Sequence, residues 1–275
     1  MSKVAAIQMT SVADVGRNLD TAAAMLRGAR AQGAVLAALP ENFAFMGLTE
    51  ADKLAIAEAP GTGPIQSFLA DTARAHGLWI VGGTVPLKIE GDARRVASAC
   101  LVYDSGGRLA ARYDKIHLFD VDIPGRAESY RESSSVRPGS EPVCVDTPVG
   151  RLGLAVCYDL RFPELFRRLL DLGAEWFCLP SAFTAPTGRA HWEVLLRARA
   201  IENLCPIVAP AQSGFHENGR ETYGDTLITD CWGKVLARLP RGTGVVAAEI
   251  DLVRSRDVRH NFPAIAHRRL TDRSE

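Results

Sequence analysis

The stretch LGLAVCYDLRFPEL, residues 152–165, has the pattern of a strand that turns into a helix around a cysteine. Apolar residues run up to Cys157, and Pro163 falls where proline is tolerated, near the first turn of a helix. Such a turn exposes the cysteine at a sheet edge, next to a helix start whose partial positive charge lowers the pKa of a thiol. Cys157 is therefore a candidate nucleophile, and a buried structural cysteine is the alternative.

Strand and helix patterns alternate on both sides of this stretch. Apolar runs predict strands at 4–9, 34–39, 78–85, 151–157, 175–179, 206–209, 226–229, 234–238 and 245–250. Helical spacing predicts helices at 18–32, after 61–64, at 162–172 and at 190–203. Turn residues at 104–107, 147–150 and 232–233 predict hairpins, which require antiparallel pairs. Two mixed sheets packed face to face, with helices outside, satisfy both observations.

Two segments lack periodicity. Residues 117–141 contain Pro124, Gly125, three consecutive serines and Pro138, so we expect a long loop, and such loops in compact domains are usually functional. The arginine-rich tail from about residue 251 is expected to be irregular. No internal repeat or long linker is visible, so residues 1–275 are expected to form a single domain.

The bulk composition argues against several classes of protein. The 32 basic residues balance 32 acidic ones, so no broad positive field favours nucleic acid or a membrane surface. No segment approaches the roughly 18 apolar residues of a membrane span, and the N-terminal apolar run of about five residues is too short for a signal peptide. A cytoplasmic location is therefore expected. The six cysteines and six histidines show no CxxC, HExxH or similar spacing, so neither disulfides nor a metal site is predicted.

Two further residues follow predicted strands directly. Glu41, in ALPENFAF, comes just after an apolar run, and Lys115, in RYDKIHLFD, follows the second strand of a hairpin. Taken alone, each has an ordinary interpretation: a strand-end glutamate that caps the next segment, and a solvated lysine at a strand end. The aromatic neighbours Tyr113 and Phe119 indicate partial burial of the lysine.

Taken together and in this chain order, the glutamate, the lysine and the cysteine resemble the nitrilase (carbon–nitrogen hydrolase) superfamily. The motifs are LPENF, YDKIHLFDVDIPG and GLAVCYDLRFPEL, and LPSAFTAPTGRAHWEVLLRARAIEN and YGDTLITDCWGKVLA also fit. The resemblance covers nearly the whole chain. It implies an α-β-β-α sandwich that pairs as a homodimer or a higher homo-oligomer, here through 162–172 and 190–203.

The resemblance also implies a mechanism for a small-molecule amide substrate, without a cofactor or a metal. Cys157 would attack as the thiolate. Glu41 would shuttle the proton, and the Lys115 ammonium with the backbone N–H of Tyr158 would stabilise the oxyanion. A second family glutamate, which orients the lysine, corresponds to Glu132, with Glu128 as the alternative.

Within the superfamily the chain looks most like the deaminated glutathione amidase branch, whose substrate carries two carboxylates and is cleaved to 2-oxoglutarate and cysteinylglycine. Arg161, Phe183 and Thr187 match pocket positions of that branch. Each also has a structural alternative: an ion pair of Arg161 with Asp159 or Glu164, a core position for Phe183, and a loop cap for Thr187.

Three other functions stay open from the sequence. An ω-amidase acting on 2-oxoglutaramate would share the same catalytic residues. A non-catalytic binding protein could use the same scaffold, although it need not retain Glu41, Lys115 and Cys157. A redox sensor could use Cys157, although no resolving cysteine lies nearby in the sequence.

Overall fold

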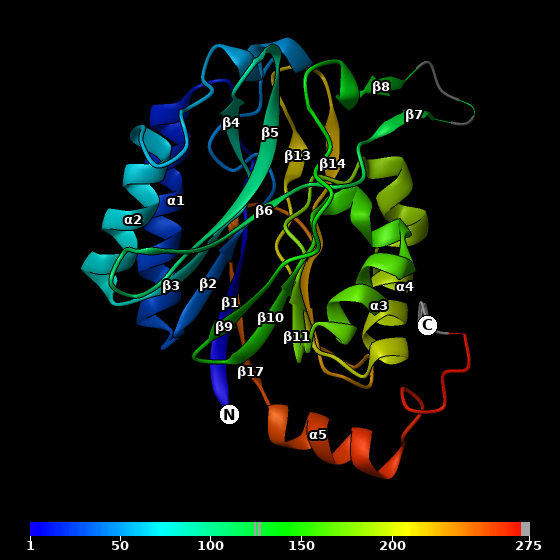
Figure 1. The fold of residues 1–275 in the computed structure, drawn as a ribbon. Helices are drawn as coiled ribbons and strands as arrows, with labels where there is room; N and C mark the ends of the chain where they lie inside the picture. Colours follow the sequence, from blue (N-terminus) through cyan, green and yellow to red (C-terminus); the bar gives the residue numbers. More distant parts are fainter. Residues whose placement is uncertain (124, 126–127, 271–275) are drawn as a thin grey trace.

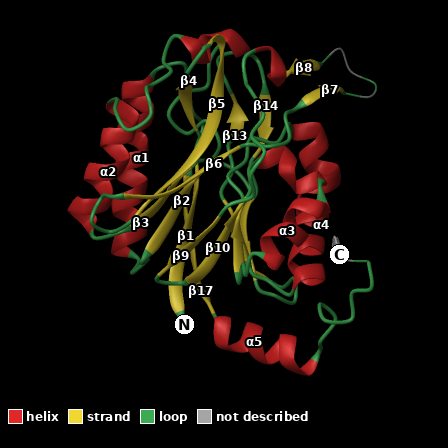
Figure 2. Cartoon of the chain, viewed as in Figure 1, coloured by secondary structure: helices red, strands yellow, loops and turns green. Residues whose placement is uncertain are grey.

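The computed structural model of the protein describes residues 1–123, 125 and 128–270. Two large mixed sheets face each other, with helices on both outer faces (Figures 1 and 2). Helices α1 (Val15–Ala31) and α2 (Pro64–His76) cover one sheet, and α3 (Pro163–Asp171) and α4 (Ala185–Asn203) cover the other. The predicted four-layer α-β-β-α sandwich is confirmed.

The first sheet contains seven strands. Their order is β17 (Gly244–Ile250), β1 (Ser2–Gln8), β2 (Leu36–Leu39), β3 (Trp79–Gly82), β5 (Asp92–Tyr103) and β4 (Val85–Ile89), with β6 (Leu109–Asp114) also paired to β5. Strands β1, β2 and β3 are parallel, and the β5–β6 pair is the predicted hairpin around residues 104–107. The expected strand 78–85 is divided between β3 and β4, because Gly83 adopts φ 54° between them.

The second sheet contains six strands. Their order is β16 (Val235–Leu239), β15 (Thr226–Thr229), β12 (Ile207–Ala209), β11 (Trp176–Cys178), β10 (Gly150–Leu154) and β9 (Cys144–Thr147). The predicted hairpins at 147–150 and 232–233 are the β9–β10 and β15–β16 pairs. The parallel strands β10, β11 and β12 lie beside each other at its centre.

Side-chain alternation divides the core into layers. In β1, Ala5 and Ile7 pack with buried residues of α1 and α2, whereas Val4 and Ala6 belong to the cluster that includes Leu152 of the second sheet. A side chain at Gly153 would instead meet Phe177 of β11, Ala174 and Leu169 of α3, so alternate positions of β10 face the helix layer. The predicted two faces of this strand are thereby confirmed.

Two expectations about irregular segments are wrong. Within 117–141 the chain forms a short antiparallel pair, β7 (Asp120–Asp122) with β8 (Ser129–Arg131), and the 3-10 turn η2 (Glu132–Ser134); residues 124, 126 and 127 lie outside the described residues. The tail forms helix α5 (Leu252–Asn261), capped by Asp251, whose carboxylate accepts the Arg254 N–H at 2.9 Å. Only Leu252 and Ser255 of α5 are buried, so its sequence carries little helical periodicity. Residues 271–275 of the tail also lie outside the described residues.

The remaining elements surround the ends of the central strands. They are the 3-10 turns η1 (Glu50–Leu54) and η3 (Cys157–Arg161), and the hairpin of β13 (Ser213–Phe215) and β14 (Glu221–Tyr223). All six cysteines are free thiols. Among the described residues, no helix is both long and apolar enough to cross a membrane.

Candidate active site

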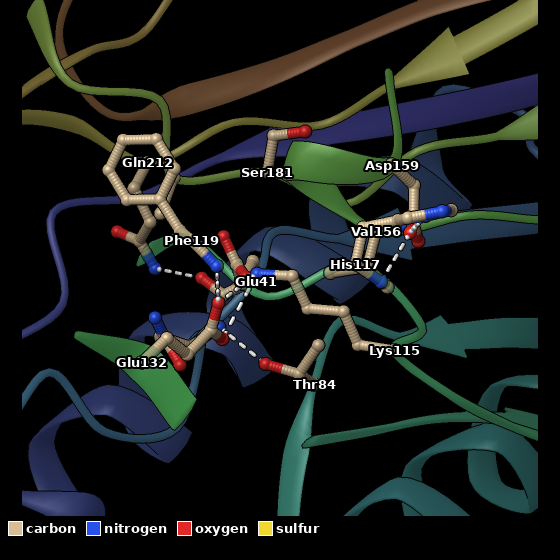
Figure 3. Close-up of polar contacts among 12 residues, drawn as sticks. Glu41, Thr84, Lys115, His117, Phe119, Glu132, Val156, Asp159, Ser181 and Gln212 are labelled. Atoms are coloured by element: carbon tan, nitrogen blue, oxygen red, sulfur yellow. Dashed lines mark hydrogen bonds and ion pairs between the residues drawn. The ribbon is translucent and has the colours of Figure 1, made fainter. Parts of the chain in front are cut away.

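Glu41 lies two residues beyond the end of β2 and is buried, with 4% of its surface exposed. Its backbone is held from two sides. Gln212 Nε2 donates to the Glu41 carbonyl at 3.0 Å, and the N–H of Asn42 donates to Thr84 Oγ1 at 2.9 Å (Figure 3). The carboxylate is therefore positioned by the fold rather than free in solvent.

Cys157 follows β10 at the first position of η3. Its backbone adopts φ 47°, and its N–H donates to the Pro180 carbonyl at 3.0 Å. A non-glycine residue in this left-handed region costs on the order of 1–3 kcal/mol, and such residues cluster at functional sites. The predicted strand-to-helix turn is confirmed, but the cysteine is buried, with 6% of its surface exposed, rather than laid open at the sheet edge.

Lys115, directly after β6, joins two carboxylates inside the protein. Its Nζ donates to Glu41 Oε1 at 2.8 Å and to Glu132 Oε1 and Oε2 at 3.0 and 2.8 Å (Figure 3). Glu132 Oε2 also accepts the Phe119 N–H at 2.7 Å. The ordinary interpretation of Lys115 as a solvated lysine is wrong, because the residue is 1% exposed.

The structure places Glu132, and not Glu128, on the lysine. The carboxylate of Glu128 instead contacts the Tyr130 hydroxyl at 3.0 Å and lies at an outer groove. Tyr158 follows the cysteine in the first turn of η3, where backbone N–H groups have no intrahelical partner.

Burial and charge shift the pKa values of this cluster. Burial alone would lower the pKa of Lys115, but the carboxylates of Glu132 and Glu41 raise it well above its usual value. Burial alone would raise the pKa of Glu132, but Lys115 lowers it below its usual value. The lysine is therefore an ammonium and Glu132 a carboxylate at neutral pH.

The expected lowering of the thiol pKa of Cys157 is wrong. Burial, and then the negative charge of Glu41, raise this pKa well above its usual value, and the opposing effect of Lys115 is smaller. The raised pKa favours the neutral thiol of Cys157, and Glu41 is the carboxylate beside it.

Asp159 ties the lysine segment to the cysteine turn. Its buried carboxylate accepts the Tyr113 hydroxyl at 2.7 Å, contacts the ring and the N–H of His117, and accepts the Val156 N–H at 2.8 Å. Tyr113 and His117 flank Lys115, whereas Val156 precedes Cys157. One carboxylate thus sets the register between the two reactive segments.

One small cavity brings most of the sequence-predicted site residues together. Of the sequence-predicted residues it is lined by Glu41, Lys115, Glu132, Cys157, Tyr158, Phe183 and Thr187. Phe183 also packs on Trp192 with ring centroids 4.9 Å apart, and Thr187 Oγ1 bonds Thr184, so their structural alternatives hold alongside the cavity position.

Arg161 does not line the cavity. Its guanidinium lies 5.7 Å from the Phe183 ring centroid and contacts the His191 ring at 3.3 Å, rather than pairing with Asp159 or Glu164 among the described residues.

The charged residues at the cavity mouth were not predicted from the sequence. Glu50, Lys53 and Arg220 line it together with Asn42, Phe119 and Tyr130. Lys53 Nζ pairs with Glu50 at 2.7 Å. Glu50 and Lys53 belong to a single 3-10 turn, and Arg220 lies in a hairpin turn, so no helical or strand periodicity marks any of them.

Comparison with known proteins agrees with this geometry. The carbon–nitrogen hydrolase family model matches residues 3–260. A relative named deaminated glutathione amidase from Synechocystis sp. is 43% identical over 96% of this chain and 97% of its own length. The Homo sapiens protein of that name is 44% identical over 97% of this chain and 82% of its own.

Solved structures share the fold. The Caenorhabditis elegans NitFhit protein has a TM-score of 0.91 and 40% identity over 98% of this chain, which spans 65% of that longer chain. Saccharomyces cerevisiae Nit3, described as a member of branch 10 of the nitrilase superfamily, has a TM-score of 0.87 and 27% identity, covering 98% and 97% of the two chains. With a family match across almost its whole length, this chain belongs to the carbon–nitrogen hydrolase family.

Proposed function

We propose that this protein is a cysteine-dependent amidase whose substrate is deaminated glutathione. The observation that carries the proposal is the buried Lys115 ammonium, held by Glu41 and Glu132 in the same cavity as the Cys157 thiol. Family membership supports the reaction class, and relatives named deaminated glutathione amidase support the substrate.

The first half of the reaction forms a thioester. Glu41 accepts the thiol proton as Cys157 Sγ bonds to the amide carbonyl carbon. The oxyanion is held by the Lys115 ammonium and the Tyr158 N–H, and the loss of one such donor typically costs on the order of 10²–10³ in rate. The C–N bond then breaks, and the leaving nitrogen takes the proton from Glu41.

The second half releases the acid. Water enters as the amine leaves, Glu41 removes one of its protons, and the oxygen attacks the thioester carbonyl. The C–S bond breaks and the proton returns to the sulfur, which restores the neutral thiol. Throughout, Glu132 keeps the lysine charged and oriented through its bonds to Nζ and to the Phe119 N–H.

The surroundings of the cavity support an extended, anionic substrate. The cavity adjoins a larger outer groove, and the two share Asn42, Glu50, Lys53, Tyr130 and Arg220 in their linings. The γ-amide of deaminated glutathione joins a five-carbon oxo acid to cysteinylglycine, so a leaving group of this size needs such a groove. Lys53 and Arg220 supply positive charge for its carboxylates.

An ω-amidase acting on 2-oxoglutaramate is the second candidate, because its substrate has the same acyl half and releases ammonia. The outer groove favours the larger substrate. A purely binding protein is disfavoured, because the strained Cys157 backbone and the buried ionised cluster both carry costs in stability. The proposal includes a reducing compartment such as the cytoplasm, with which six free thiols agree.

The proposal extends to pairing of two chains through α3 and α4. The apolar side chains of Val194 and Ile201 on α4 are 68% and 47% exposed, and Trp232, on the neighbouring β15–β16 turn, is 52% exposed. Covering such a surface is favourable, at roughly 25 cal/mol per Å² of apolar area. Light scattering of the purified protein tests this, with twice the monomer mass or a larger multiple expected, and a monomer would refute it.

The test of function compares two substrates. Release of cysteinylglycine from deaminated glutathione and of ammonia from 2-oxoglutaramate are measured as kcat/KM, with Cys157→Ala as the control. We expect at least a tenfold preference for deaminated glutathione, about 1.4 kcal/mol, and no activity in the variant. A preference for 2-oxoglutaramate would move the assignment to ω-amidase, and an active Cys157→Ala protein would refute the mechanism.

A further inference from the structure

Arg220 is the cation of this cavity whose charge is not balanced by an ion pair. Lys115 has two carboxylate partners and Lys53 has one, whereas among the described residues no carboxylate lies within 4.0 Å of the Arg220 guanidinium. Within the part of the chain that the structure describes, the Nε of Arg220 is buried and has no hydrogen-bond partner. A guanidinium in this state has donors available for an incoming anion.

The side chain of Arg220 is nevertheless held in place. Its Nη2 donates to the Ala182 carbonyl, and its guanidinium lies 5.1 Å from the centroid of the Tyr130 ring. One donor is therefore committed to the protein, and the aromatic face orients the planar group. The remaining donors belong to a side chain that lines both the cavity and the outer groove.

The backbone that carries Arg220 is also fixed. In the turn between β13 and β14, the His216 N–H donates to the Arg220 carbonyl at 2.9 Å, and the Gly219 N–H donates to the His216 carbonyl at 2.9 Å. The buried His216 ring contacts the Ser11 carbonyl at 2.8 Å and Thr222 Oγ1 at 2.7 Å. The arginine is thus preorganised, which lowers the entropic cost of binding a ligand.

Residues 180–182 contact both the Cys157 backbone and the Arg220 guanidinium. The Pro180 carbonyl accepts the Cys157 N–H at 3.0 Å, and the Ala182 carbonyl accepts from Arg220. Two residues of extended chain span at most about 7 Å. A five-carbon acyl group extends about 5 Å over its four C–C bonds, and a hydrogen bond to the far carboxylate adds about 3 Å. Cys157 and Arg220 also line the same cavity, so the terminal carboxylate of an acyl group on the sulfur and the Arg220 guanidinium face the same space.

We propose that Arg220 binds the carboxylate of the acyl half of the substrate, and so selects ω-monoamides of five-carbon dicarboxylic acids. The inference deepens the proposed function and rests on it. It assigns the oxo-acid carboxylate, which deaminated glutathione and 2-oxoglutaramate share, and not the carboxylate of the leaving peptide. Arg161 does not take this role, because it lies outside the cavity lining and contacts His191.

The unmodified enzyme provides the first test. Glutaramate (the monoamide of glutaric acid) and pentanamide have the same carbon chain and leaving group, and differ only in the terminal carboxylate. Ammonia release should favour glutaramate by at least about 100-fold in kcat/KM, because pentanamide leaves the half-buried Arg220 guanidinium, whose Nε is buried, without a carboxylate partner. Equal rates on the two amides would overturn the proposal.

Variants provide the second test. Arg220→Gln should lose about 100-fold or more on deaminated glutathione and on 2-oxoglutaramate alike, with a much smaller loss on pentanamide. Arg220→Lys should recover part of the loss, because it keeps the charge without the planar fork. Arg74→Gln, an exposed arginine on α2, is the matched control and should behave as the unmodified protein. A loss confined to deaminated glutathione would assign Arg220 to the leaving peptide, and an equal loss on pentanamide would make its role structural; either result overturns the proposal.

A binding measurement keeps the test independent of turnover. Calorimetry on the Cys157→Ala protein should detect 2-oxoglutarate, and adding Arg220→Gln should weaken that binding at least tenfold. Unchanged affinity, or no binding to either protein, would overturn the proposal even where deaminated glutathione is hydrolysed. Conversely, Arg220-dependent binding without hydrolysis of deaminated glutathione would refute the proposed function alone.

Discussion

Replacing Lys115 by methionine tests whether the buried cluster is ionised as the structure indicates. The change keeps most of the side-chain volume but removes the cation that lies within 3.0 Å of both Glu41 and Glu132. Two buried carboxylates are then left without their shared partner, and removal of one member of a buried ion pair typically costs about 3–5 kcal/mol. The Glu132 carboxyl can avoid part of this cost by taking up a proton.

The size of the effect depends on pH. Protonating a carboxyl whose unfolded pKa is about 4.3 costs about 3.7 kcal/mol at pH 7, since each pH unit contributes about 1.36 kcal/mol, but only about 1 kcal/mol at pH 5. In a protein of this size each kcal/mol lowers Tm by roughly 2–4 °C. The variant should therefore melt roughly 7–15 °C below the unmodified protein at pH 7 and only a few degrees below it at pH 5.

The two proteins should also show opposite pH slopes. In the unmodified protein Lys115 holds the pKa of Glu132 below its usual value, so the stabilisation is present above the unfolded pKa and is lost as pH falls through the folded pKa. In Lys115→Met the folded pKa of Glu132 lies above the unfolded one, so stability falls as pH rises from about 4.3.

Calorimetric melting between pH 4.5 and 8 measures this difference. Lys53→Met is the matched control, because its partner Glu50 is 36% exposed and a partly solvated pair contributes less than about 1 kcal/mol. A deficit for Lys115→Met that is the same at every pH, or that grows on acidification, would refute the assignment of a buried ammonium between two carboxylates.

Three further predictions concern the same site. Burial and Glu41 raise the pKa of Cys157, so this residue should give no thiolate signal up to about pH 8.5, where a free cysteine is half ionised. The measurement is the difference in 240 nm absorbance between the unmodified protein and Cys157→Ala. A thiolate signal at neutral pH would contradict the prediction. Asp159→Asn should lower both kcat and Tm, at a cost of about 1.5–3 kcal/mol, because it weakens the charged hydrogen bonds between the Lys115 and Cys157 segments. Kinetics and melting that match the unmodified protein would exclude this role for Asp159. Glu132→Gln should keep the Phe119 contact and reduce kcat about 100-fold. It should change stability by less than about 1 kcal/mol, because the buried group of Glu41, Lys115 and Glu132 loses its net negative charge. A parallel loss of stability would show that Glu132 acts through folding.

Much of the architecture is predictable from local patterns. Period-2 and 3.6-residue spacing, together with turn residues, identified most central strands and four of the five described helices, because these periodicities follow from the geometry of each element. Helix α5 was not predicted because it buries only two residues. Strands β7 and β8 were not predicted because each is only three residues long. The catalytic candidates Glu41, Lys115 and Cys157 could be named because each lies within three residues of the end of a strand and belongs to a family motif.

The protonation of the site residues and their neighbours could be known only from the tertiary structure. Local sequence around Cys157 indicates a lowered thiol pKa, yet burial and a carboxylate from another sheet reverse the direction. Arg220 lies in a turn, and nothing near it in the chain shows that it shares a cavity with Cys157. Lys115 and Glu41 are 74 positions apart, and Gln212 and Glu41 are 171 apart. The sequence by itself determined most of the central strands and helices, because their periodicity is local, whereas desolvation and charge pairing depend on distances between remote segments, which only the packed structure decides.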